Sequence, residues 1–384
     1  MRQHFFKTGQ ILNFYDVYKL VSQSPDYKAL PTKVSKQIIR RLDKNWVSWK
    51  GAIKEYKKNP HKFTGIPKLP KYKDKEKGRN IAPYPSDAIS VVALRKGFSS
   101  LSKSNISLKT KQEKINEVRI IPQACCYVIE IVVTVETPEL SNKNAVASID
   151  LGLNNLMAVT TNQSGIKPLL VNGKPLKSIN QFYNKRKSKL QSIAATSQIK
   201  SITHKRNCRV ENYLHTASRR VIQWCQKYQI GTLIIGQNEG WKDSINIGKK
   251  NNQQFVCVPH ARLIQMLTYK AELAGIKVIL TEESYTSKAS ALDNDFLPLY
   301  GEKVYTEQLV VSAVELSRSV PDFSGKRVKR GLYKTSNGQL INAYINGSLN
   351  IGRKVIPNYI EGTGGLPCVP WVLNPLRTLI TRFL

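Results

Sequence analysis

An apolar strand, an amphipathic helix and a second apolar strand follow one another in the middle of the chain, and this order restricts the fold more than any other feature. The first strand is TLIIG at residues 232–236, and the second is KVILTEE at residues 277–283. The helix between them ends at Gly275, and one of its sides is formed by Leu263, Met266, Leu267 and Ala274. Two strands joined by a helix at this spacing pair in parallel, so we predict an α/β domain.

A β-hairpin pattern precedes this unit. The segment AVASIDLGLNNLMAVTTNQSG, which starts at residue 145, contains two short apolar runs separated by a glycine-bearing turn. The first run ends at Asp150, just before Gly152. Proteins of the α/β class place functional groups at the carboxyl ends of their strands, which makes Asp150 a candidate. Because many surface strands also end in Asp, the position alone is weak support for a site.

The region up to residue 140 mixes helical and strand patterns. A helix is predicted over about residues 30–60, where Pro60 ends it and its apolar face is formed by Val34, Ile38, Leu42, Trp46 and Trp49. Residues 124–136 alternate as a strand. The predicted organisation is a basic mixed α+β module at 1–140, an α/β domain at 141–357 with a basic helical insertion at about 174–225, and a poorly ordered or domain-covering tail at 358–384.

The charge of the chain indicates its partner. Sixty Lys and Arg residues stand against 26 Asp and Glu residues, a formal net charge of +34. Such an excess repels itself in a compact protein unless a polyanion neutralises it, and Lys and Arg contacts with nucleic acid release phosphate counterions. No apolar run approaches the roughly 20 residues of a membrane span, and the start of the chain lacks a signal-peptide segment. We expect a cytoplasmic protein of the bacterial cytoplasm or nucleoid, with no membrane partner.

Several segments resemble the TnpB family of transposon-encoded, RNA-guided nucleases, which are related to type V CRISPR effectors. SIDLGLNNLMAV is similar to the first motif of the family's RuvC-like domain. Further similar blocks are the basic segment at 30–80, TLIIGQNEGWK, FVCVPHARLIQML, ESYTSKAS and FSGKRVKRGLYKTSNGQLINAYINGSLNIGRK. They follow the family's order over most of residues 30–357. The resemblance implies an RNase H-like (RuvC) domain, and an amino-terminal module that recognises a guide RNA and a short motif in the target DNA.

In this family, three acids from separate elements bind Mg²⁺ for phosphodiester hydrolysis. The resemblance assigns the first acid to Asp150. Many relatives carry the second at the strand end where this chain has Gly236, and Glu239 follows in a loop. Other relatives supply it from the next strand, which here gives Glu283 with Glu282 beside it. We expect the Gly236 strand to lie between the other two, so that Glu283 reaches Asp150 across the glycine.

The third acid of the family pattern is missing, because Tyr344 stands at its position in INAYINGSLNI. A phenol with a pKa near 10 is neutral at pH 7 and is a poor ligand for Mg²⁺. We therefore predict a remnant catalytic set of Asp150, Glu283 and Glu282. Asp150 and Glu283 would be the ligands of any Mg²⁺, which would bind weakly, and the nuclease would be inactive.

The zinc ribbon of many relatives is missing as well. The six cysteines form no Cys-x-x-Cys pair, and none lies between Cys257 and Cys368, so the sequence excludes a cysteine-bound zinc there. The segment FSGKRVKRGLYKTSNG is predicted to form a metal-free hairpin around Asn337 and Gly338.

Basic residues in three regions are candidates for contacts with nucleic acid, and the alternative for each is an ordinary solvated surface. They are Lys50, Lys54, Lys57, Lys71 and Lys73; Lys185, Arg186, Lys187, Lys189, Lys205 and Arg206; and Lys326, Arg327, Lys329 and Arg330. The predicted function is guide-directed DNA binding without cleavage, by a repressor or a scaffold that recruits a separate effector protein. An active Mg²⁺-dependent RNA-guided DNA endonuclease of a transposon, and a decayed transposon relic, stay open as alternatives.

Overall fold

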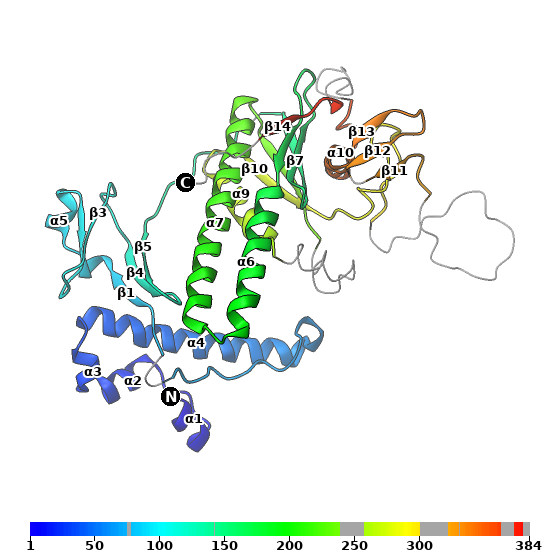
Figure 1. Ribbon diagram of the computed structural model, residues 1–384. Helices are drawn as coiled ribbons and strands as arrows, with labels where there is room; N and C mark the ends of the chain where they lie inside the picture. Colours follow the sequence, from blue (N-terminus) through cyan, green and yellow to red (C-terminus); the bar gives the residue numbers. More distant parts are fainter. Residues whose placement is uncertain are drawn as a thin grey trace, which may run out of the picture. The chain divides into compact units, whose positions relative to one another are not determined.

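The computed structural model describes residues 1–74, 78–141, 143–238, 257–299, 322–329, 331–361 and 372–378. The chain divides into two compact units, an amino-terminal unit at Met1–Glu136 and a carboxyl-terminal unit at Thr137–Leu384 (Figure 1). Within the described ranges, no helix is both long enough and apolar enough to cross a lipid bilayer.

The amino-terminal unit is built from helices and short antiparallel strands. Its helices are α1 (Arg2–Thr8), α2 (Phe14–Val21), α3 (Pro25–Lys28), α4 (Thr32–Lys58) and α5 (Val91–Arg95), with 3-10 turns at Pro60–Lys62 and Ser86–Ala88. Its strands are β1 (Ala82–Pro85), β2 (Phe98–Ser100), β3 (Ser107–Lys109), β4 (Glu117–Pro122) and β5 (Tyr127–Val132). The strands form one sheet in the order β1-β4-β5 and a separate β2-β3 pair.

Helix α4 is the predicted helix, and it ends at Lys58, before Pro60. Val34 and Trp46 on its apolar face are buried, and Val34 joins a core with Tyr84 and Val118 of the sheet. Leu42 on the same face is 37% exposed, against the prediction. Val34 is covered by the sheet and Trp46 packs against Phe5 of α1, whereas Leu42 lies between these two contacts along the helix.

The carboxyl-terminal unit contains the α/β domain. Its strands are β6 (Val146–Leu151), β7 (Asn155–Thr161), β8 (Leu169–Asn172), β9 (Thr232–Gly236), β10 (Lys277–Thr281), β11 (Lys326–Lys329), β12 (Leu332–Lys334), β13 (Leu340–Asn342) and β14 (Leu376–Thr378). Its helices are α6 (Lys174–Ser192), α7 (Thr196–Lys227), α9 (His260–Glu272) and α10 (Ala343–Val355).

A six-stranded mixed sheet in the order β10-β9-β6-β7-β8-β14 is the frame of this unit. Strands β6, β7 and β8 form an antiparallel meander, and β9 and β10 add to it in parallel on the β6 side. This arrangement is RNase H-like and confirms the predicted fold class. The strand with Gly236 lies between the strand of Asp150 and the strand that leads to Glu283, as predicted.

Helices cover both faces of the sheet because the strands alternate apolar side chains to either side (Figure 1). Ile149 and Ile235 belong to a core shared with α7 and α9, whereas Val146 and Ile234 belong to a second core shared with α10. Asp150 is four residues after Val146 in β6, and side chains alternate between the two faces of a strand. The Asp150 side chain is therefore on the same face as Val146, which is the α10 face.

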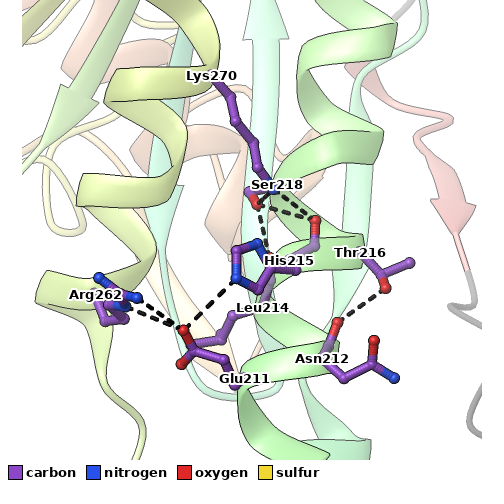
Figure 2. Close-up of polar contacts among 8 residues, drawn as sticks. All are labelled: Glu211, Asn212, Leu214, His215, Thr216, Ser218, Arg262 and Lys270. Carbon is purple, nitrogen blue, oxygen red and sulfur yellow. Dashed lines mark hydrogen bonds and ion pairs between the residues drawn. The ribbon is translucent and has the colours of Figure 1, made fainter. Parts of the chain in front are cut away.

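Polar contacts fix α7 against α9 (Figure 2). Glu211 accepts hydrogen bonds from Arg262 at 2.9 and 3.2 Å, and Lys270 donates to the His215 carbonyl at 2.9 Å and to Ser218 Oγ at 2.7 Å. Glu211 is the one acid in the basic sequence from Lys174 to Arg220. Because it pairs with Arg262 of α9, it does not neutralise the cations of that sequence.

The expected hairpin and the described parts of the expected tail, residues 358–361 and 372–378, pack within this unit. Strands β12 and β13 pair around Gly338, whose φ is +82°, which confirms the hairpin predicted there. The sequence did not predict β14, which pairs in parallel with β8 and extends the sheet beyond the expected domain end at residue 357. Tyr359 is also fully buried in the core beneath α10.

Candidate active site

The carboxyl ends of β6, β9 and β10 bring Asp150 and Glu283 to one edge of the sheet. Ile149 is opposite Ile235, and Gly236 is opposite Thr281, so the three strand ends are level. A Cβ on Gly236 would lie 3.0 Å from Glu283 Oε2 and 2.6 Å from Ile351 Cδ1. The missing side chain is therefore what lets the Glu283 carboxylate lie over β9 and face Asp150.

Asn238 holds Glu283 in this position. The Glu283 amide donates to Asn238 Oδ1 at 2.9 Å, and Asn238 Nδ2 donates to Glu283 Oε1 at 3.5 Å. Sequence reasoning missed Asn238. Its only signal was its place just after the end of β9, where a polar side chain can reach the neighbouring strand end.

Burial determines the charge state of the two acids. It raises the pKa of Glu283 to about 7. It also raises the pKa of Asp150 well above its usual range, with a further increase from the Glu283 charge and an opposing effect of the Arg327 charge. A carboxyl that loses water and faces a second carboxyl keeps its proton more strongly. Without a cation, the pair does not carry two full negative charges at neutral pH.

The stability of this unit is expected to fall as pH rises through the Glu283 transition. In the unfolded chain this carboxyl ionises near its usual pKa of 4.5, whereas the folded protein keeps the proton until about pH 7. The folded state therefore binds more protons between these values, and raising the pH favours unfolding. Urea unfolding followed by circular dichroism at pH 5 and 7.5 should show this loss, and Glu283→Gln should reduce it. Glu272→Gln, at an exposed position on α9, is the control and should leave the loss unchanged.

Glu282 takes a different role from its neighbour. Its Oε1 forms an ion pair with Lys354 near the end of α10, and its Oε2 accepts from the Ser284 amide at 3.1 Å. The Lys354 side chain is only 4% exposed, and burial lowers the pKa of this lysine to about 8. Both oxygens of Glu282 are thus engaged away from Asp150, and the structure does not bring Glu282 into the pair.

Helix α10 approaches Asp150 through small residues. A Cβ on Gly347 would lie 2.9 Å from Asp150 Oδ2. The next residue, Ser348, donates to the Ser148 carbonyl at 2.9 Å, and Ser148 Oγ donates to the Ser348 carbonyl at 2.7 Å. These reciprocal hydrogen bonds fix the height of α10 above β6, so any group in its first turn is held beside the strand end.

Tyr344 is in that first turn. Asn342 caps the helix and accepts from the Tyr344 amide at 3.0 Å. The ring lies against Gly152, where a Cβ would be 2.8 Å from Tyr344 Cε1. The Arg327 guanidinium of β11 lies over the ring, with its Cζ 5.9 Å from the ring centroid. The first turn of α10 thus places a phenol, with a cation nearby, beside the end of the Asp150 strand.

These donors fit one divalent cation. Two carboxylates at one edge suit a hard cation such as Mg²⁺, which is bound through one or two protein carboxylates. A pair of ions needs further anionic oxygen, and the phenol of Tyr344 does not supply it. If Mg²⁺ binds, Asp150 and Glu283 are the residues that would hold it.

Two family models match this chain. Residues 130–242 match a family described as a probable transposase, OrfB_IS605, and residues 260–351 match the Cas12f1-like TNB domain. The chain belongs to the TnpB family. This places it in a group of RNA-guided nucleases that includes Cas12f-like proteins.

Two solved structures are similar to this TnpB-family chain over most of its length. One is the cryo-EM structure of the Cas12f1–sgRNA–target DNA complex, with 13% identity, a TM-score of 0.36, and coverage of 91% of this chain and 87% of that one. The other is the CRISPR-Cas12f ternary complex, with 14% identity, a TM-score of 0.38, and coverage of 91% and 77%. A search among curated proteins found no match.

Most basic candidates of this TnpB-family chain are exposed. Lys50, Lys54 and Lys57 are exposed on α4, Lys185, Arg186 and Lys189 on α6, and Lys205 on α7, while Lys187 of α6 is half-buried. Lys71 and Lys73 lie in the loop after α4, where Lys73 donates to the Arg79 carbonyl, and Lys326, Arg327 and Lys329 lie on β11. Arg330 is outside the described residues.

Arg206 differs from these exposed cations. It donates to Asn180 Oδ1 at 2.7 Å and to the Cys257 carbonyl at 2.8 Å, and it lies 5.7 Å from the Tyr183 ring centroid. Its guanidinium joins α7 to α6 and to the segment before α9. Arg206 therefore has a structural role in this unit, and its five donors are not all open to phosphate.

Proposed function

We propose that this protein is an RNA-guided DNA-binding protein in which target recognition is retained and DNA cleavage is lost. The observation that carries the proposal is Tyr344, a neutral ring beside Gly152 where the family pattern has the third acid. Guide pairing and phosphate contacts do not depend on metal ligands, so binding and cutting are separable. The partners would be a guide RNA and a target DNA.

The charge distribution supports the binding half of the proposal. Exposed cations follow α4 and α6, and the single acid of the long basic segment pairs with Arg262. Cations without acidic neighbours are available to phosphate groups, whose counterions they release on binding. A protein that binds DNA in this way without cutting it would act as a repressor or would recruit a separate effector protein.

Sequencing of the RNA that copurifies from the host context tests the guide hypothesis. We expect one enriched species whose variable end specifies the bound DNA. Affinity for DNA matched to that end should exceed affinity for a scrambled duplex by about a hundredfold or more, since unmatched DNA receives only the phosphate contacts. Random RNA fragments, or equal affinity for the two duplexes, would contradict RNA guidance.

The exposed cations of α6 give a second test. Replacing Lys185, Arg186 and Lys189 with Gln should lower the slope of log affinity against log salt by about 2 to 3, because each phosphate contact contributes about 0.9. The loss should be equal for all sequences. Lys277→Gln changes an exposed cation at the amino end of β10 and should leave the slope unchanged. An unchanged slope in the triple variant would make this face of α6 a solvated surface.

A further inference from the structure

The ring of Tyr344 packs against two glycines. Gly152 follows β6, and its absent Cβ would lie 2.8 Å from Tyr344 Cε1. Gly331 is between β11 and β12, has a φ of +85°, and its absent Cβ would lie 4.0 Å from Tyr344 Cε2. The ring therefore fills the space between the end of the Asp150 strand and the β11–β12 hairpin. A side chain at Gly152 would overlap with the ring.

The hairpin is tied to the helix that carries the ring. The Ala343 amide donates to the Gly331 carbonyl at 3.1 Å, so the start of α10 and the β11–β12 turn are hydrogen-bonded. Tyr333 of β12 is fully buried, and its hydroxyl donates to the Lys288 carbonyl at 2.7 Å. Arg327, which pairs with Tyr333 across the hairpin, is consequently held near Tyr344 by the backbone and not only by its own side chain.

Two aspartates, Asp293 and Asp295, hold the hairpin through Ser324 and Ser336. We call these four residues the aspartate–serine clasp. Asp293 accepts from Ser324 Oγ at 3.1 Å and from Ser336 Oγ at 2.7 Å, and Asp295 accepts from Ser324 Oγ at 2.6 Å. Ser324 precedes β11, and Ser336 is in the turn between β12 and β13. The clasp thus fixes both ends of the segment that presents Arg327.

The Arg327 guanidinium lies over the ring that packs at the end of the Asp150 strand. Arginine keeps its charge at every accessible pH, and its planar group suits the face of an aromatic ring. A divalent ion that enters beside the acids would meet this fixed positive charge, whereas in a three-acid site it would meet a carboxylate.

We propose that Arg327, held over the Tyr344 ring at the end of the Asp150 strand, is the resident counter-cation of Asp150 and takes the electrostatic place of a second divalent ion. The site then binds one divalent cation at most, and binds it weakly. This inference rests on the proposed function, because it assumes that the three-acid set has been lost. It goes beyond that function by assigning a role to the residue opposite the tyrosine.

Manganese binding to the full chain tests the inference without any measurement of DNA cleavage. Free Mn²⁺ is measured by electron paramagnetic resonance during titration, and ions that also bind to Asp150→Asn are subtracted as surface or RNA-bound ions. Arg327→Gln should lower the Kd of the Asp150-dependent Mn²⁺ about tenfold, since a unit positive charge several ångströms away is removed. Arg327→Lys keeps the charge, so its Kd should stay within about threefold of that of the unchanged protein.

Lys326→Gln is the matched control, because it removes one charge from the adjacent exposed position of the same strand. If Arg327→Gln and Lys326→Gln tighten Mn²⁺ binding equally, the inference is wrong, and the proposed function is untouched. Two Asp150-dependent ions in the unchanged protein would instead overturn the loss of the metal site, and with it the proposed function. Near-ultraviolet circular dichroism of each variant establishes that its folded packing is retained.

A pair of variants separates the tyrosine from the arginine. Tyr344→Asp places a carboxylate beside the guanidinium, where the two groups would form an ion pair. We therefore expect a second Asp150-dependent Mn²⁺ only when Tyr344→Asp is combined with Arg327→Gln. A second ion with Tyr344→Asp alone would show that Arg327 does not hold that position and would overturn the inference.

Discussion

Incubated with matched DNA and Mg²⁺, the RNA-bound protein is expected to bind its target and leave both strands intact. Asp150 and Glu283 share one sheet edge, but the first turn of α10 offers them Tyr344, and Glu282 is paired with Lys354. A two-ion displacement needs ligands for both ions, and the remaining set fits one. Removing one member of a catalytic set commonly lowers turnover by about a thousandfold or more, so cleavage should be at background level.

Electrophoresis of end-labelled target strands, run beside a binding assay on the same sample, measures both halves of this expectation. Asp150→Ala is the control, because it removes the acid at the centre of the site and leaves the basic surfaces unchanged. Target cleavage that requires Mg²⁺ and disappears in Asp150→Ala would show an active nuclease, the alternative that the sequence left open. Binding at the same affinity in both proteins, with no product in either, is the expected result.

The same substitution at two helical glycines is expected to change stability in opposite directions. A Cβ on Gly352 of α10 would lie 2.6 to 2.7 Å from three atoms of the Tyr359 ring. Tyr359 is fully buried, and its hydroxyl is hydrogen-bonded to Ser148 Oγ at 3.0 Å, so the ring cannot move without disturbing the contact between α10 and β6. Gly352→Ala should therefore destabilise the carboxyl-terminal unit by about 2 to 4 kcal/mol.

Gly51 is within α4, and a Cβ there would meet nothing within 4 Å. Alanine in an open helical position gains about 0.5 to 1 kcal/mol over glycine, so Gly51→Ala should stabilise the amino-terminal unit. Thermal and urea unfolding followed by circular dichroism measure the two effects. If Gly352→Ala were neutral or stabilising, the Tyr359 ring would be displaced at little cost in free energy, which would contradict the close packing of α10 against Tyr359.

The sequence was sufficient to predict the frame of the site, for reasons that are local. Apolar runs and one amphipathic helix indicated two parallel strands, and parallel strands align their carboxyl ends at one edge. That alignment, together with the glycine at position 236, predicted that Glu283 could reach Asp150. The apolar run carries this information most clearly for β9, which is buried from Leu233 to Gly236, whereas β10 is only partly buried at the edge of the sheet.

The surroundings of the acids could not be predicted in this way. Asn238, the Arg327–Tyr344 contact and the pairing of Glu282 with Lys354 depend on side chains that meet across long stretches of chain. No spacing in the sequence encodes such contacts, because they depend on the height of α10 above the sheet and on the anchoring of the hairpin. Strand β14 escaped prediction because three residues at a sheet edge leave no period to detect.

The aspartate–serine clasp has a practical consequence for handling this protein. The described anchors of the hairpin beside the site are hydrogen bonds among carboxylates, hydroxyls and amides, which need neither a thiol nor a chelatable ion. Treatment with EDTA or with a reductant should leave this hairpin folded. Chelation can therefore strip divalent ions from the acid pair selectively, and any accompanying change in DNA affinity reports on those ions and not on a collapsed scaffold.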